Sequence, residues 1–219
     1  MTYDDFQKLC AQSKAGSAAQ RVSALAALEP YRVKNAVLMA AGYGSRLAPI
    51  TDKKPKGLLR IRGEVLVERQ IQQLIAAGIE DIFLVVGYRK EQFSYLASDP
   101  HVHIVENPDY WRYNNTSSVY RVLDVLDNTY ICSADNYFTE NVFEPYVCRS
   151  YYAAVYGEGP TEEYYLSVDA DDRISHVQIG GDRGWYMMGQ VYFSRAFSEK
   201  FRSLLKPEYE RNAAIREML

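Results

Sequence analysis

Apolar and polar residues follow an alternating strand and helix pattern from Ala36 onward. Short, largely apolar runs predict buried β-strands, because both faces of a parallel sheet are covered. These runs lie at residues 36–41, 82–87, 101–105 and 129–134. Amphipathic segments between them predict helices at residues 64–77, near 90–97 and from about 117. The alternation predicts an α/β fold with a Rossmann-like, mainly parallel sheet flanked by helices.

Two of the predicted helices carry an apolar stripe that would face the sheet. In each, apolar residues recur at the three- and four-residue spacing of one helix face. The stripe at residues 64–77 consists of Val67, Ile71, Leu74 and Ile75, and the stripe after residue 117 consists of Val119, Val122, Leu123 and Leu126. Ligands of such sheets bind beyond the carboxyl ends of the strands, so polar residues that follow a strand are the functional candidates.

Residues 1–32 are predicted to form an N-terminal helical extension, with residues 33–219 as the main domain. A break at residues 14–17 separates two helical runs and favours a hairpin of two short helices. The two helices carry three cations, too few for a module that reads DNA. We expect the extension to dock onto the main domain or onto a second subunit, as in a homodimer. The apolar residues at helical spacing are Tyr3, Phe6, Leu9 and Cys10 in the first helix and Val22, Leu25 and Leu28 in the second.

Composition places the chain among ordinary globular proteins. At 219 residues and 47% hydrophobic, it is long enough for one sizeable core plus a small appendage. A net charge of −3 argues against general nucleic-acid binding. The sequence lacks both a long apolar run and a basic, signal-like start, so we expect no membrane partner and a cytoplasmic location. Cys10, Cys132 and Cys148 are odd in number and widely spaced, which predicts buried, reduced thiols.

A glycine-broken loop follows the first predicted strand. Gly42 and Gly44 allow backbone angles closed to other residues and let main-chain amides approach a ligand. Arg46 and Lys56 supply the positive charge that pyrophosphate and a transferring phosphoryl group require. A short glycine motif alone is most often only a tight turn. The loop also lacks a Walker ending, and Leu47 stands where a dinucleotide-binding loop has its third glycine.

The complete loop resembles the signature of nucleotidyltransferases that make sugar and alcohol diphosphonucleosides. That signature, A-A-G-x-G-x-R-L-x-P-x-T followed by P-K, matches without a break from Ala40 to Thr51 and again at Pro55 and Lys56. The resemblance implies the fold of nucleotide-diphospho-sugar transferases and a bound nucleoside triphosphate. It also implies which residues of the loop line the nucleotide: Ala40, Ala41, Gly42, Gly44 and Ser45.

Two further polar motifs follow later strands. Gly87 permits close approach of a ligand, and Tyr88 is placed to cover a base or a ribose. Asn114, Asn115 and Ser117 lead into a helix. A plain helix cap accounts for one such residue, but two adjacent asparagines exceed what a cap needs. We therefore expect this segment to hold the base or the phosphate chain.

Asp135 ends the strand at residues 129–134 and is the predicted metal ligand. Mg²⁺ takes hard oxygen ligands close to the phosphates that complete its shell. A plain Asp-Asn turn is the alternative, but nucleotidyltransferases place their catalytic aspartate at this strand end. His101, His103 and His176 fit surface or sheet positions better than a metal site.

Three later stretches narrow the resemblance to bacterial CTP:phosphocholine cytidylyltransferases. They are residues 85–93, 113–115 and 134–137, and the likeness extends over about residues 34–205. It implies Mg²⁺-dependent transfer of CMP from CTP to phosphocholine, or to a close aminoalkyl phosphate or phosphonate, with release of pyrophosphate. By this resemblance Lys56 steadies the α-phosphate and the incoming phosphate. Arg46 and the amides after Gly42 hold the β- and γ-phosphates, and Asp135 holds Mg²⁺.

Aromatic residues are dense in the second half of the chain, which fits a quaternary ammonium acceptor, because aromatic faces with nearby carboxylates bind such cations. Tyr164 and Trp185 are the predicted acceptor residues, since the family carries aromatics near both places; Glu162 and Glu163 precede Tyr164. Tyrosines in strands are more often plain sheet residues. A sugar-1-phosphate nucleotidyltransferase, which would need polar partners for sugar hydroxyls, and a non-catalytic nucleotide-binding regulatory module remain alternatives.

The chain departs from this family at three places. Gly57 stands where alanine is usual, and Ser133 where related enzymes often have a first aspartate. Family members also continue to a later aspartate that completes the metal site, and residues 208–219 offer no replacement. We therefore expect either a fragment of a longer or fused protein whose domain is incomplete at its C-terminus, or an incomplete metal site.

Overall fold

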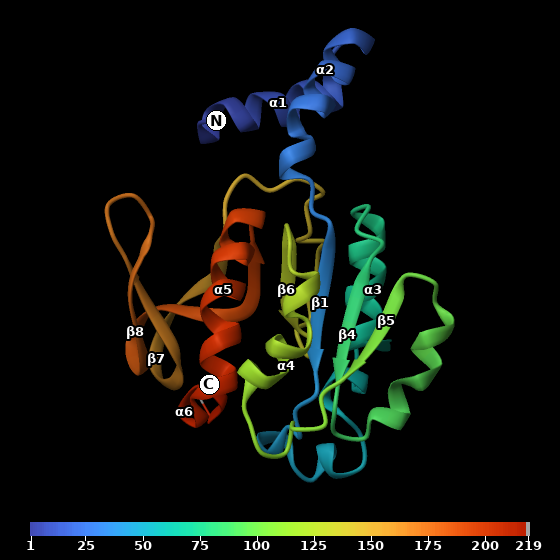
Figure 1. The fold of residues 1–219 in the computed structure, drawn as a ribbon, viewed down its shortest axis with the longest axis vertical. Helices are drawn as coiled ribbons and strands as arrows, with labels where there is room; N and C mark the ends of the chain where they lie inside the picture. The colour runs from blue at the N-terminus through green and yellow to red at the C-terminus, as the bar shows by residue number, and fades with distance from the viewer. Residues whose placement is uncertain (218–219) are drawn as a thin grey trace.

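The computed structural model describes residues 1–217. Its main sheet has six strands in the order β5-β4-β1-β6-β8-β7 (Figure 1). The first four in this order run parallel: β5 (Val102–Glu106), β4 (Ile82–Val86), β1 (Asn35–Ala40) and β6 (Thr129–Ser133). Strand β8 (Ile174–Phe193) pairs antiparallel with β6, and β7 (Tyr151–Val168) pairs antiparallel with β8. The predicted mainly parallel α/β sheet flanked by helices is confirmed.

Residues of β1 alternate between two apolar layers, one on each face of the sheet. Leu38 packs into the layer under helix α3 (Leu66–Ala76), together with Ile71 and Leu74 of that helix. Val37 packs into the opposite layer, which holds Val122, Leu123 and Leu126 as predicted. Both layers are needed because a parallel sheet is buried on its two faces. Figure 1 shows α3 on one side of the sheet and α4 with α5 on the other.

Three helix predictions need correction at their ends or in their type. Residues 64–65 pair with residues 60–61 as a short hairpin, β2 (Arg60–Ile61) with β3 (Glu64–Val65), so α3 begins only at Leu66. The segment Lys90–Ser98 is a 3₁₀ helix. Helix α4 (Asn115–Arg121) stops before its predicted stripe ends, and Leu123–Val125 forms a separate 3₁₀ turn. The stripe residues after Arg121 are nevertheless buried, because packing rather than helix length decides their position.

Helices α1 (Tyr3–Ala15) and α2 (Ala18–Leu28) form the predicted hairpin, here called the N-terminal arm, which projects from the amino-terminal edge of the sheet (Figure 1). Ser17 caps α2 through a capping box with Gln20. The predicted apolar stripe of α2 is wrong in part: Leu28 is buried, but Val22 and Leu25 are 69% and 42% exposed. Two helices offer each other only one face, so the rest of α2 stays exposed.

The arm also touches the main domain. The guanidinium carbon of Arg149 lies 5.7 Å from the ring centroid of Tyr3. A cavity of about 310 Å³ separates α1 from the segment that precedes β7, and Tyr3, Phe6 and Tyr146 are among its lining residues. Aromatic side chains of the arm and of the domain thus face each other across this cavity.

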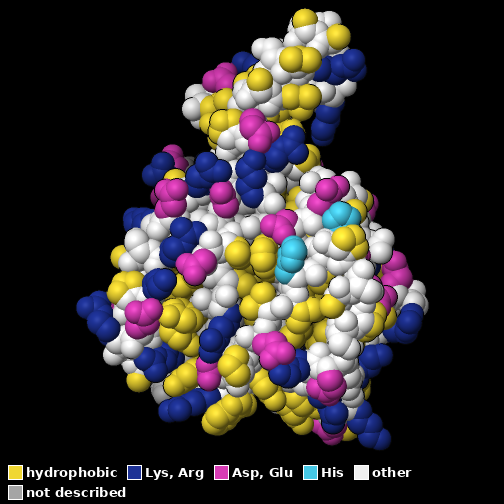
Figure 2. All heavy atoms as spheres, turned by 45° about the vertical axis from the view of Figure 1, so that its right-hand side comes forward, with side chains coloured by type: hydrophobic (Ala, Val, Ile, Leu, Met, Phe, Trp, Pro, Cys, Tyr) yellow, Lys and Arg dark blue, Asp and Glu magenta, His cyan; other side chains and the backbone are white. Residues whose placement is uncertain are grey.

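The surface mixes charges of both signs. Figure 2 shows Lys and Arg side chains interspersed with Asp and Glu over one face of the main domain, and apolar side chains on the arm. Within residues 1–217, no helix is long and apolar enough to cross a bilayer. Cys132 is buried as predicted, whereas Cys10 and Cys148 are only partly buried.

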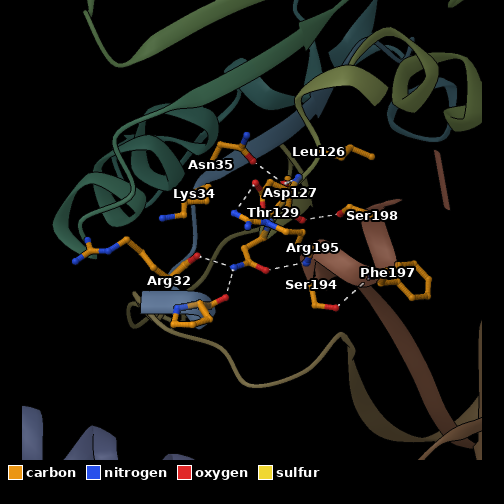
Figure 3. Close-up of polar contacts among 12 residues, drawn as sticks. Arg32, Lys34, Asn35, Leu126, Asp127, Thr129, Ser194, Arg195, Phe197 and Ser198 are labelled. Carbon is orange, nitrogen blue, oxygen red and sulfur yellow. Dashed lines mark hydrogen bonds and ion pairs between the residues drawn. The ribbon is translucent and has the colours of Figure 1, made fainter. Parts of the chain in front are cut away.

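The Asn128 side chain is the centre of a polar network that joins the segment before β1, the start of β6 and helix α5 (Arg195–Arg211). Arg32, Asp127 and Arg195 of this network are labelled in Figure 3. Its Nδ2 donates to the carbonyl oxygens of Pro30 and Arg32 at 2.9 Å each, and its Oδ1 accepts from the amide of Arg195 at 2.7 Å. Beside it, Asp127 pairs with the Arg195 guanidinium at 2.9 Å. Burial opposes ionisation of Asp127, but hydrogen bonds from Arg195 and the Asn128 amide hold its pKa below the usual value.

Replacing Asn128 with alanine is expected to lower the free energy of unfolding by about 2–4 kcal/mol, because the buried amide is lost and three backbone groups lose their hydrogen-bond partner. Urea unfolding followed by circular dichroism measures this change. Asp124→Ala is the control, since the Asp124 side chain is 84% exposed, and its effect should stay within about 0.5 kcal/mol. An Asn128→Ala protein that unfolds at the wild-type urea midpoint would contradict the assigned role of this network.

Candidate active site

The glycine-broken loop leaves β1 at the carboxyl edge of the sheet. Ala40 and Ala41 are buried at the end of the strand. Gly44 has a φ of 74°, in the left-handed region, and its carbonyl accepts a hydrogen bond from the Thr51 hydroxyl at 3.0 Å. The conformational argument for Gly42 was wrong, because Gly42 has no positive φ and an added Cβ there would meet no atom. Of these two glycines of the loop, only Gly44 requires glycine for its backbone angles.

Lys56 and Asp135 come together although they are 79 positions apart in the chain. The Lys56 Nζ lies 3.1 Å from an Asp135 carboxylate oxygen, with the two side chains 25% and 35% exposed. Lys56 also lies against Gly44, where a Cβ would stand 2.7 Å from the Lys56 Cγ. The loop, the lysine and the aspartate thus form one site at the carboxyl edge of the sheet. Gly57 fits here because an added Cβ would lie only 3.2 Å from the Cβ of Ala134.

The turn that carries Asp135 is held by residues that the sequence analysis missed. Gln70 of α3 is fully buried, and its Nε2 donates to the carbonyls of Ser133 and Asn136 at 3.0 Å each. Asn136 in turn donates to the carbonyl of Met188 on β8 at 2.8 Å. These bonds fix the direction in which the Asp135 side chain leaves the turn. The signal for Gln70 was present in the sequence, because a glutamine adjoins Val67 and Ile71 on the apolar face of α3.

Gly87 and Tyr88 lie beside the loop. An added Cβ on Gly87 would be 2.7 Å from the ring of Tyr110, so close packing explains this glycine. The Tyr88 hydroxyl donates to the carbonyls of Thr51 and Asp52 at 3.1 and 2.8 Å, which ties β4 to the end of the loop. A structural role for Tyr88 is thus visible, while its contact with a nucleotide stays a prediction.

The asparagine segment opens helix α4. Asn114 is the N-cap residue and makes no side-chain cap hydrogen bond; both it and Asn115 are exposed. Ser117 is buried, and its hydroxyl donates to the Asn114 carbonyl and accepts from Asn107, each at 2.8 Å. The hydroxyl of Ser117 therefore anchors the helix start, whereas the two asparagines present their side chains at the surface. Asn107, which the sequence analysis did not single out, supports this turn.

Arg46 lies in a 3₁₀ turn of the loop with Ser45, and its side chain is 76% exposed. Its guanidinium pairs with Glu163 of β7 at 2.9 Å. Arg46 thus links the loop to the β7–β8 hairpin. Among the described residues, no hydrogen bond or ion pair joins Arg46 to Lys56.

The predicted acceptor residues lie on the β7–β8 hairpin. Tyr164 is half-buried, and Trp185 is 45% exposed. The ring of Trp185 contacts Tyr156 at a centroid distance of 5.4 Å, and within residues 1–217 no ring contact joins it to Tyr164. The two residues therefore do not form one closed aromatic cage in this structure, and their role stays a prediction.

Asp135, the predicted metal ligand, is a single carboxylate at the end of β6. Among the described residues, no group of three or more His, Cys, Asp or Glu side chains is placed to hold a metal. Mg²⁺ is commonly bound through one or two carboxylates, with phosphates and waters as its other ligands. A partly exposed aspartate beside a loop predicted to bind phosphates fits a site of that kind.

A second cavity lies away from these residues. It has a volume of about 680 Å³ and follows the outer side of α3. Arg60, Glu64 and Arg69 line it, and none of the predicted site residues does. The candidate site therefore rests on the convergence of loop, lysine and aspartate rather than on the size of a cavity.

The family model of the MobA-like NTP transferase domain matches residues 36–212, which include the loop, Lys56 and Asp135. The chain belongs to this family. The matched residues of this NTP transferase begin after the N-terminal arm. The division at residues 32 and 33 stays a prediction, and residues 218–219 of the predicted main domain lie outside the described part.

Two curated relatives of this NTP transferase are similar over most of their length. A choline-phosphate cytidylyltransferase from Streptococcus pneumoniae is 37% identical over 174 residues, which cover 80% of this chain and 76% of the relative. A 2-aminoethylphosphonate cytidylyltransferase from Lancefieldella rimae is 38% identical over 180 residues, covering 80% of this chain and 73% of the relative.

A solved structure supports the same relationship. The CTP:phosphocholine cytidylyltransferase of Streptococcus pneumoniae superposes with a TM-score of 0.77 at 38% identity, covering 82% of this chain and 78% of the other. The predicted membership of the nucleotidyltransferases is thereby confirmed, together with the fold that it implied.

Proposed function

We propose that this NTP transferase transfers CMP from CTP to phosphocholine or to a close aminoalkyl phosphate or phosphonate, releasing pyrophosphate. The observation that carries the proposal is the similarity to two cytidylyltransferases over 80% of the chain. The acceptors named for those relatives share an amino or ammonium group joined by a short chain to a phosphate or phosphonate. The contact between Lys56 and Asp135 supports the proposal, because it joins the nucleotide loop to the strand end where a metal ligand is expected.

The reaction needs positioning and charge neutralisation. An acceptor phosphate oxygen attacks the α-phosphorus in line, the new P–O bond forms, and the bond from the α-phosphorus to the bridging oxygen breaks as pyrophosphate leaves. In the proposed roles, Lys56 neutralises the charge that develops at the α-phosphorus. Arg46 and the loop amides hold the leaving β- and γ-phosphates. No protein nucleophile is required.

The family is one that generally depends on a divalent metal, and we infer Mg²⁺ for this protein. Asp135 would hold the ion, which when bound supplies further neutralisation of the phosphates. Lys56 lies 3.1 Å from the same carboxylate and keeps Asp135 oriented. We propose CTP and the acceptor as the protein's small-molecule partners and the cytoplasm as its location.

Pyrophosphate release across a panel of substrates tests the proposal. CTP, UTP and dTTP are each combined with phosphocholine, 2-aminoethylphosphonate and glucose-1-phosphate. We expect release with CTP and an amine-bearing acceptor. Release only with glucose-1-phosphate would favour a sugar nucleotidyltransferase, and nucleotide binding without any release would favour a regulatory module; either result overturns the proposal.

Trp185→Leu and Tyr164→Leu are expected to raise the KM for phosphocholine several-fold and to leave CTP affinity almost unchanged, because aromatic faces act on the ammonium group alone. Steady-state kinetics with phosphocholine and with a primary-amine acceptor measure the effect, which should be larger for phosphocholine. Ile174→Ala is a control on the same hairpin, since Ile174 is 47% exposed and pairs with Val168 rather than with either aromatic. Equal losses for both acceptors, or weaker CTP binding, would show that these aromatics shape the fold or the nucleotide site.

A further inference from the structure

Arg46, the residue proposed to hold the β- and γ-phosphates, already has an anionic partner. Its Nη1 lies 2.9 Å from Oε1 of Glu163, a residue 117 positions later in the chain. Carboxylates and phosphates both bind guanidinium through charge-assisted hydrogen bonds, often in pairs. Glu163 therefore binds the guanidinium group that the triphosphate is proposed to use. The Glu163 carboxylate and the triphosphate would then compete for Arg46.

The backbone around Glu163 explains why this carboxylate reaches the loop. Strand β7 is irregular there, with register shifts between Glu158 and Thr161 and between Thr161 and Tyr164. The amide of Glu163 donates to the Thr161 hydroxyl at 3.2 Å instead of continuing the ladder. Such irregularities redirect side chains. The Glu163 carboxylate thus reaches Arg46. The next residue in the chain is Tyr164, a predicted acceptor residue.

We propose that Glu163 is a positioning residue that couples nucleotide binding to acceptor binding. In the free protein its carboxylate neutralises Arg46 and holds the β7–β8 hairpin to the nucleotide loop. A triphosphate carries more negative charge and displaces it from Arg46, with no covalent bond made or broken. The released carboxylate, one position from Tyr164 in the chain, then attracts the cationic end of the acceptor. Nucleotide therefore binds first and raises the affinity for the acceptor; the acceptor half of this inference rests on the proposed function.

Inorganic tripolyphosphate tests the competition, because it engages the phosphate residues without a base or an acceptor. Glu163→Gln should bind Mg²⁺-tripolyphosphate about two- to fivefold more tightly in calorimetry, the range expected for loss of an exposed ion pair. Glu162→Gln removes the same charge from the adjacent residue, for which the structure shows no ion pair within residues 1–217, and should change the affinity less. In an Arg46→Gln background the effect of Glu163→Gln should disappear. Equal effects of the two glutamine variants, or no tightening, would overturn the competition.

The dissociation constant of phosphocholine, measured with and without a non-hydrolysable CTP analogue, tests the coupling. The wild-type protein should bind phosphocholine more tightly with the analogue, and Glu163→Gln should lose most of that difference. The same dissociation constant in both states, or no binding in either, would overturn the coupling. A protein that shows the tripolyphosphate effect but forms no CDP-choline would contradict the proposed function while leaving the competition at Arg46 intact.

Discussion

Lys56→Ala is expected to lower kcat/KM for CTP and the acceptor by a factor of about 100 or more, because charged contacts that strengthen in the transition state contribute several kcal/mol. Lys56 is the cation held between the glycine loop and Asp135, so its charge lies where the α-phosphate is expected. The melting temperature should change little, since a partly exposed ion pair contributes little to stability. Initial rates of pyrophosphate release and thermal unfolding of the same preparation measure both effects.

Lys54→Ala is the matched control for this prediction. Lys54 precedes Lys56 by two positions in the same loop, and its side chain is exposed. Its loss should leave kcat/KM within a factor of about two. A Lys56→Ala protein with wild-type kcat/KM, or one whose loss of activity follows its loss of folded protein, would remove Lys56 from the catalytic machinery.

Asp135→Asn is expected to reduce turnover by a similar factor while CTP still binds. The substitution keeps the shape of the side chain and removes the charge that a divalent cation needs. The turn should keep its structure, because Gln70 bonds the carbonyls of Ser133 and Asn136 and not the Asp135 side chain. Turnover measured across a Mg²⁺ titration, together with calorimetric CTP binding, separates the two effects.

Asp124→Asn provides the control, since its side chain is 84% exposed and lies outside the site. Turnover of Asp135→Asn at the wild-type rate, with the same dependence on Mg²⁺, would show that another group carries the ion.

The parallel half of the fold could be predicted because its apolar runs in the sequence are the strands buried in the middle of the sheet. Strands β1, β4 and β6 are apolar on both faces, and the motif residues follow them directly. Since parallel strands end at one edge, polar residues that follow these strands were the functional candidates, and the structure shows Lys56 against both Gly44 and Asp135. Strand period and chain direction indicated the edge of the sheet where the site lies, and the loop motif with its resemblance indicated which residues to expect there.

The remaining parts depend on contacts between distant segments, which local pattern does not encode. The insertion of β8 between β6 and β7 follows from long-range pairing and bulges. The bonds of Asn128 and Gln70 satisfy backbone groups of segments that come together only in the complete fold. The exposure of Val22 has the same origin, because a helical stripe predicts a buried face only where a partner covers it.

Phosphorus NMR of one reaction mixture tests the central claim most directly. The protein is incubated with CTP, phosphocholine and MgCl₂, and the spectrum is followed over time. The account predicts that the CTP resonances decline while pyrophosphate and the paired diphosphate signals of CDP-choline appear in equal amounts, and that Lys56→Ala slows both together. Unchanged CTP resonances with folded protein, or phosphate formed without a CDP-linked product, would contradict cytidylyl transfer as the function of this site.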